Sequence, residues 1–298
     1  MLDKGHFKVL YFDQDKTLYH KKVCGLSKVV WWMKIEIFQT KLTPFIRDVT
    51  FRVMTPDGYE DGDRLYPVLY MNDGQDIFRD EESFSGHSLR YADYYTDYAR
   101  FLPQIIIVGI DCPSTNRERS IQYAPYTKCF DVPEWSTYES QVVGRGREYL
   151  DWMTSELKPW IDENYRTRKQ GAYTALGGFS SGTLVSTYGV IMYPDFFSRL
   201  LCIGGSFYNW MDKLDETFEQ ANLDHIKYIY LDVGTNEQGR LTTAEQFMEG
   251  TKMIYRRFVD CGFDETQLKY RLLKGLTHTQ GSWRLRFPDA VRWVFRDL

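Results

Sequence analysis

The stretch "TALGGFSSGTLVSTYG", residues 174–189, decides the fold class. Its first six residues form a short apolar run of the kind found in strands buried on both faces, and the residues after the turn are compatible with a helix. The turn between them, "GFSSG" at residues 178–182, fits the pattern G-x-S-x-G. A strand, a sharp turn flanked by glycines and a helix are what a nucleophile elbow requires. Glycine and serine also populate ordinary turns, so the prediction of Ser180 as a nucleophile depends on finding its partners.

Short apolar runs alternate with helical stretches from Met33 to the C-terminus. This alternation predicts one α/β domain, residues 33–298, with a mostly parallel central sheet and helices on both faces. Two earlier segments alternate like half-buried strands, "MKIEIFQT" and "RDVTFRVMT". The expected buried strands are "YPVLYMN", "QIIIVGID", "YTALGGF", "RLLCIGG" and "YIYLDVG", and the expected helices are residues 146–165, the segment after residue 182, residues 242–262 and residues 288–298.

Residues 1–32 are predicted to be an N-terminal extension. Their segment "VLYFDQDKTLY" imitates the D-x-D-x-T motif of haloacid-dehalogenase-like phosphatases, with Asp13 in the place of the nucleophile and Asp15 in that of the acid. Only about fifteen residues separate this motif from the strands of the next domain, too few to bury a core of their own. The phosphatase interpretation is therefore not favoured.

Composition excludes several classes of function. The chain has 298 residues, with 37 basic against 41 acidic side chains, and no basic stripe suited to a phosphate backbone. Its five cysteines are scattered, without a C-x-x-C pair, which predicts neither a disulfide framework nor a zinc site and favours a reducing cytoplasm. We expect a small-molecule substrate, no metal or organic cofactor, and no nucleic-acid or membrane partner. Self-association into a homo-oligomer is left open.

A serine nucleophile needs a general base, and in α/β-hydrolases the acid and then the histidine follow the serine in the chain. His225 and His278 are the two histidines after Ser180. His225 precedes a predicted strand and so belongs to the amino edge of the sheet, whereas catalytic groups gather at the carboxyl edge. His278 lies in a loop between the strand "KYRLLK" and the last helix, so it is the expected base.

The acid is expected just beyond the strand "YIYLDVG", where Glu237 lies in the following loop. Asp232 is the alternative, but it lies within that strand, where the pleat fixes its direction. The oxyanion hole should combine the N–H after the nucleophile with one from the loop after an early strand. We assign these to the backbone N–H groups of Ser181 and Gln75, although "NDGQ" around Gln75 also reads as an ordinary turn.

Together these segments resemble the esterase family of α/β-hydrolases that includes esterase D, enterochelin esterases, feruloyl esterase modules and bacterial mycolyltransferases. The resemblance extends from about Arg64 to the C-terminus and implies Ser180 as nucleophile, His278 as base and Glu237 as acid, where many relatives have Asp. It rests on "YPVLYMNDGQDIF", "IIVGIDCPSTNRERSIQYAPY", "YLDWMTSELKPWIDENYRT", "GGFSSGTLVSTYGVIMYPDFFSRLLCIGGSF", "DVGTNE" and "SWRLRFPDAVRWV".

The implied activity is hydrolysis of a small or medium carboxylic ester through an acyl-enzyme. The alternatives are acyl transfer to an alcohol with the same triad, and a non-catalytic binding protein of the same fold. Ser181 and His87 depart from the family pattern, which often has a small residue or methionine and a tryptophan there, so relatives' substrate preferences do not transfer. The loop at residues 127–146 is either a rim of the substrate pocket or a solvated surface loop.

Overall fold

The computed structural model describes residues 7–12, 33–131, 140–239 and 242–298. Asp13 and Asp15, which carry the phosphatase-like motif, lie outside these ranges. No helix in the described ranges is long and apolar enough to cross a membrane.

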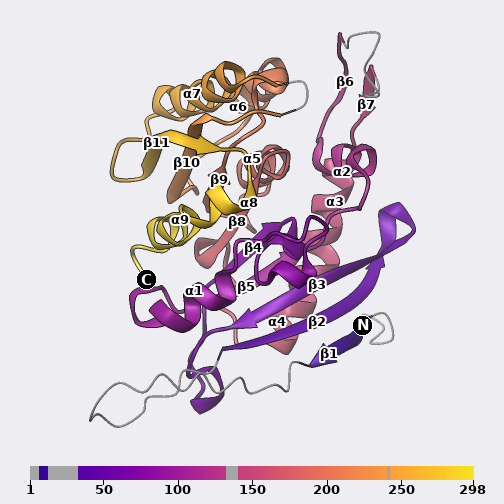
Figure 1. The fold of residues 1–298 in the computed structure, drawn as a ribbon, viewed down its shortest axis with the longest axis vertical. Coiled ribbons are helices and arrows are strands. Elements are labelled where there is room, and N and C mark those ends of the chain that lie inside the picture. Colours follow the sequence, from indigo (N-terminus) through magenta and orange to yellow (C-terminus); the bar gives the residue numbers. More distant parts are fainter. Residues whose placement is uncertain (1–6, 13–32, 132–139, 240–241) are drawn as a thin grey trace.

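A single large sheet organises the fold (Figure 1), and among the described residues it has nine strands in the order β1-β2-β3-β5-β4-β8-β9-β10-β11. The pairings among β1, β2, β3 and β5 are antiparallel, and all those from β5 to β11 are parallel. The predicted mostly parallel α/β sheet is therefore confirmed. The strands are β1 (Lys8–Phe12), β2 (Lys34–Leu42), β3 (Arg47–Thr55), β4 (Val68–Asn72), β5 (Ile106–Ile110), β8 (Thr174–Phe179), β9 (Arg199–Ile203), β10 (Tyr228–Asn236) and β11 (Leu268–Thr277).

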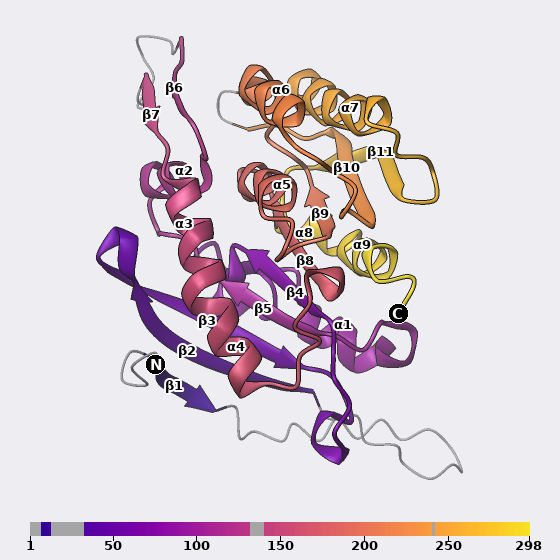
Figure 2. The same cartoon turned by 180° about the vertical axis from the view of Figure 1, so that it is seen from behind.

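Helices cover both faces of the sheet, as predicted. Successive residues of each strand face opposite sides, and since the buried strands are apolar at consecutive positions, both faces need a covering layer. In β4, for example, Tyr70 packs in one core cluster and Met71 in the other. One cluster contains residues of α3 to α7, of which α3 and α4 cross in front of β2 and β3 in Figure 2, and the other contains residues of α1 and α9. The helices are α1 (Tyr91–Tyr98), α2 (Asn116–Tyr123), α3 (Gly146–Trp152), α4 (Lys158–Asn164), α5 (Gly182–Met192), α6 (Met211–Gln220), α7 (Ala244–Asp260), α8 (Gln280–Arg284) and α9 (Phe287–Val294).

Two of the predicted helices show local features of interest, a capping box and a π-helical segment. Thr243 forms a capping box with Gln246 at the start of α7, in the helix predicted over residues 242–262. The helix predicted over residues 146–165 is continuous, but a π-helical segment, Met153–Leu157, separates α3 from α4.

Two segments lie at the margins of the fold. Strand β1 belongs to the segment predicted as an extension and pairs with β2 at the end of the sheet, where the ring of Phe7 stacks on Trp160 with centroids 4.7 Å apart. Within the loop at residues 127–146, β6 (Thr127–Cys129) and β7 (Gln141–Val143) form a hairpin that projects from the body of the molecule (Figure 1).

Candidate active site

Ser180 lies in a strained turn between β8 and α5, at the carboxyl edge of the sheet. Its φ is +53°, a left-handed conformation that few non-glycine residues adopt. The turn is tight because Gly178 has no side chain: a Cβ there would lie 2.6 Å from the carbonyl carbon of Gly182. The Ser180 N–H donates to the Ile203 carbonyl at 3.2 Å, which fixes the turn against the end of β9. This is the strand, turn and helix geometry of a nucleophile elbow.

The three side chains predicted as a triad lie together. His278, in the loop after β11, has its Nε2 2.9 Å from the Ser180 Oγ. Its Nδ1 is 2.6 Å from Oε2 of Glu237, which follows β10. An imidazole held by a carboxylate at one nitrogen and by a hydroxyl at the other can act as a general base toward that hydroxyl.

Glu237 is fully buried, and its second oxygen is also satisfied. Oε1 accepts hydrogen bonds from the Gly234 N–H at 2.9 Å and from Arg286 Nη2 at 2.7 Å. Burial by itself raises the pKa of Glu237, but the hydrogen bond to His278 and the charge of Arg286 outweigh it and hold the pKa below its usual value. The carboxylate is therefore ionised near neutral pH and can stabilise an imidazolium.

Asp232, the alternative acid, has different partners. It lies within β10, where Oδ1 accepts from Arg286 at 2.8 Å and Oδ2 accepts from the Tyr230 hydroxyl at 2.9 Å. Burial raises its pKa to about 6. The structure thus brings Glu237, rather than Asp232, to the imidazole.

Aromatic rings enclose the imidazole of His278. The centroid of Phe247 lies 4.4 Å from the imidazole centroid, and Trp283 meets the imidazole edge-on at 4.9 Å. Trp283 in turn stacks on Phe179, the last residue of β8, at 5.3 Å. These rings restrict the rotation of the imidazole and exclude water from one side of it.

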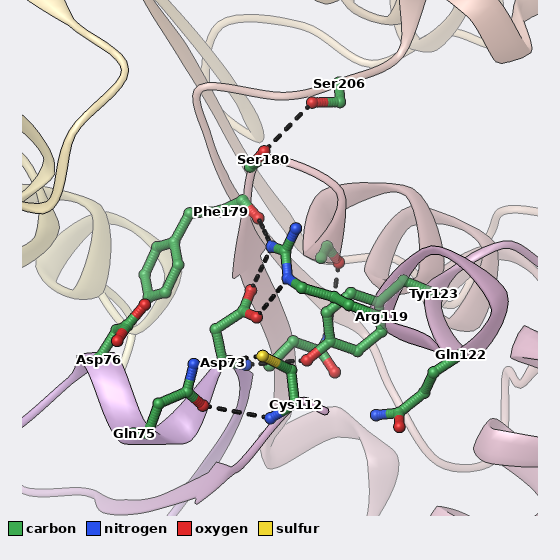
Figure 3. Close-up of polar contacts among 12 residues, drawn as sticks. Asp73, Gln75, Asp76, Cys112, Arg119, Gln122, Tyr123, Phe179, Ser180 and Ser206 are labelled. Carbon is green, nitrogen blue, oxygen red and sulfur yellow. Dashed lines mark hydrogen bonds and ion pairs between the residues drawn. The ribbon is translucent and has the colours of Figure 1, made fainter. Parts of the chain in front are cut away.

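Gln75 lies in a short 3-10 helix, Gly74–Asp76, directly after β4. Its side chain is turned toward Cys112, accepting from the Cys112 N–H at 3.1 Å and donating to Sγ at 3.2 Å (Figure 3). Among the hydrogen bonds of the described residues, none is donated by the backbone N–H of Gln75 or of Ser181. Neither N–H predicted for the oxyanion hole is therefore taken up by an acceptor within the described part of the chain, although Gln75 itself is buried.

An ion pair that the sequence analysis missed ties this loop to the nucleophile turn (Figure 3). Asp73, with φ +59°, receives two hydrogen bonds from Arg119 of α2, at 2.7 and 2.8 Å. The same guanidinium donates to the Phe179 carbonyl at 3.4 Å, and the Tyr123 hydroxyl accepts from the Asp73 N–H at 3.0 Å. Arg119 thus connects the loop after β4 with the end of β8.

The turn after β9 also contacts the nucleophile. The Ser206 N–H donates to the Ser180 carbonyl at 3.3 Å, and the two serine Oγ atoms are 3.4 Å apart (Figure 3). His225 has no such contact: its Nε2 lies 2.7 Å from the Val190 carbonyl, near the end of α5. Over the described residues, no cluster of three or more His, Cys, Asp or Glu is arranged to hold a metal ion.

The sheet and the elbow at its carboxyl edge define an α/β-hydrolase, and the class of activity is carboxylic-ester hydrolysis. The chain belongs to the esterase family: the family model described as "Putative esterase" matches residues 44–294. The predicted family resemblance is confirmed.

Individual relatives are distant. The uncharacterized protein YbbA of Bacillus subtilis (strain 168) is 22% identical over 247 residues, covering 82% of this chain and 92% of that protein. The IroE-like serine hydrolase from Shewanella oneidensis is 20% identical with a TM-score of 0.69, covering 89% of this chain and 81% of the other. A ferulic acid esterase is 15% identical with a TM-score of 0.64, covering 89% of this chain and 98% of the other. At these identities the two solved structures show a shared fold.

Proposed function

We propose that this esterase hydrolyses a small or medium carboxylic ester through a triad of Ser180, His278 and Glu237. One observation carries the proposal: a continuous chain of contacts, 2.9 Å from the serine hydroxyl to the imidazole and 2.6 Å from the imidazole to the carboxylate. The Glu237 carboxylate selects the tautomer with the proton on Nδ1, which leaves Nε2 free to accept the serine proton.

In the first half of the reaction, the Ser180 Oγ attacks the ester carbonyl carbon while Nε2 of His278 takes the hydroxyl proton. The carbonyl oxygen becomes an oxyanion, for which the backbone N–H groups of Gln75 and Ser181 are the proposed donors. Losing one such donor costs about 10²- to 10³-fold in rate. As the tetrahedral intermediate collapses, the imidazolium gives its proton to the departing alkoxide, and the acyl group stays on Ser180.

In the second half, water attacks the acyl-enzyme. His278 takes a proton from the water, and the second tetrahedral intermediate releases the carboxylic acid as the serine oxygen recovers its proton. If an alcohol replaces water in this step, the product is a new ester, so added acceptor alcohols separate hydrolysis from acyl transfer.

The test is turnover of p-nitrophenyl esters of increasing acyl length, feruloyl esters and siderophore esters by the wild type and two matched variants. Ser180→Ala should abolish turnover while leaving the fold intact. Ser181→Ala should keep substantial activity, because the proposed contribution of Ser181 is a backbone N–H that alanine also has. Equal loss in the two variants rejects Ser180 as the nucleophile, and absence of turnover of every ester by the wild type favours a binding protein.

A further inference from the structure

Arg286 is a buried cation just behind the proposed triad, in the link between α8 and α9, with only 1% of its surface exposed. Its Nη2 donates to Glu237 Oε1 at 2.7 Å and to the Thr277 carbonyl at 3.3 Å, and Nη1 donates to Asp232 Oδ1 at 2.8 Å. Nε donates to the Ser282 carbonyl at 3.4 Å. A single guanidinium therefore holds the proposed acid, a second carboxylate and the residue that precedes the proposed base.

The charges in this cluster are unbalanced in a way that suits the reaction. Both carboxylates are fully buried, so with Arg286 the cluster carries a formal net charge of −1 when Glu237 and Asp232 are ionised. Protonation of His278 during attack brings the sum to zero. Because uncompensated charge is costly in a buried site, this arrangement favours the imidazolium that forms in the transition state.

Other titratable groups face this cluster from β10 itself and from the strands on either side of it. The Tyr230 hydroxyl, also on β10, donates a hydrogen bond to Asp232, and the Cys202 thiol of β9 lies close enough to Asp232 to interact with its charge. On β11, Arg271 lies near both Tyr230 and Asp232 and pairs with Asp289 at 3.3 Å. None of these groups contacts the Glu237 carboxylate in the described part of the chain, whereas Arg286 donates to it directly.

We propose that Arg286 is a positioning residue that holds Glu237 ionised and aimed at His278, and that Asp232 balances its charge. This inference rests on the proposed function, because it assigns the source of the acid's orientation within that triad. It gives Asp232 a role distinct from that of the acid: Asp232 supplies a negative charge that partly offsets the positive charge of Arg286 beside Glu237.

The test is the pH profile of kcat/KM for Arg286→Met and Asp232→Asn. The acid limb of the profile reports deprotonation of the general base. In Arg286→Met the imidazolium loses a nearby like charge and the cluster becomes more negative, so the acid limb should move to higher pH, by about one unit. In Asp232→Asn the cluster becomes less negative, so the acid limb should move to lower pH by a smaller amount. If both variants lower kcat/KM at every pH without moving either limb of the profile, Arg286 has only a structural role and the proposal is overturned.

Two controls keep the result interpretable if Arg286→Met folds poorly. Arg286→Lys keeps the charge and should return the acid limb toward the wild-type position. Introducing Arg286→Met into a Glu237→Gln background should cause little further loss in the rate of labelling by a fluorophosphonate probe, because Arg286 acts through the carboxylate. A loss as large as in the wild-type background contradicts that route.

Failure of this inference can be told from failure of the triad. If Glu237→Gln retains wild-type kcat, the proposed acid is wrong, and the inference falls with it. If Glu237→Gln loses orders of magnitude but neither Arg286→Met nor Asp232→Asn moves the acid limb, the triad stands and the role of Arg286 is refuted.

Discussion

Substituting Gly204 by alanine should damage catalysis far more than stability. Gly204 follows β9 with φ +58°, and a Cβ there would lie 2.4 Å from Glu237 Oε2 and 3.0 Å from Trp283 Nε1. Oε2 is the oxygen that faces His278. Relieving this contact requires the carboxylate to retreat by about 1 Å, and a misplacement of that size can cost about 10²-fold in rate. We therefore expect kcat to fall about a hundredfold.

A matched glycine separates this effect from backbone strain. Gly58 has φ +69°, and the nearest atom to a Cβ there is 4.0 Å away. Both alanine variants should lose about 1–2 kcal/mol of unfolding free energy from the left-handed conformation. Urea unfolding measures that loss, and p-nitrophenyl acetate turnover measures kcat. Wild-type kcat in Gly204→Ala, or equal losses of kcat in the two variants, refutes the reasoning.

Two further predictions concern stability. Burial raises the pKa of Asp232 from its ordinary 3.8 to about 6, so the folded protein binds that proton more tightly than the unfolded chain does. This carboxyl therefore lowers the free energy of unfolding as pH rises from 3.8 to about 6, and urea titrations across that range should show the contribution vanish in Asp232→Asn. Removing the residues before Met33 deletes β1 and the stacking of Phe7 on Trp160, so the melting temperature should fall. The kcat of the folded fraction should stay unchanged, because β1 is at the far end of the strand order from β9, β10 and β11; a large drop in kcat would show that β1 supports the site.

The parts of the site that sequence predicts best follow from chain order and strand ends. A motif between a strand and a helix predicts Ser180, and the position after the last expected strand predicts His278. Glu237 is favoured over Asp232 because a loop residue is free to turn where a strand residue is not. The structure brings the three side chains together at the carboxyl edge of the sheet, while their catalytic roles remain predictions.

What the sequence could not supply are contacts between distant segments. Arg119 meets Asp73 across 46 residues, and Arg286 meets Asp232 across 54, and nothing in the local pattern of either arginine indicates its partner. The segment "SWRLRF" contributed to the family resemblance, yet the stacking of Trp283 on Phe179 depends on the final packing of α8.

The central claim is that the acyl group is carried on Ser180, and mass spectrometry of the acid-quenched enzyme tests it most directly. The enzyme is mixed with a p-nitrophenyl ester, quenched within the first turnover, digested and sequenced by fragmentation, which separates position 180 from position 181. The proposed mechanism predicts one acyl adduct, on Ser180, that is absent from Ser180→Ala. An adduct on Ser181 or on another residue, or steady hydrolysis with no adduct on Ser180 at any quench time, would contradict it.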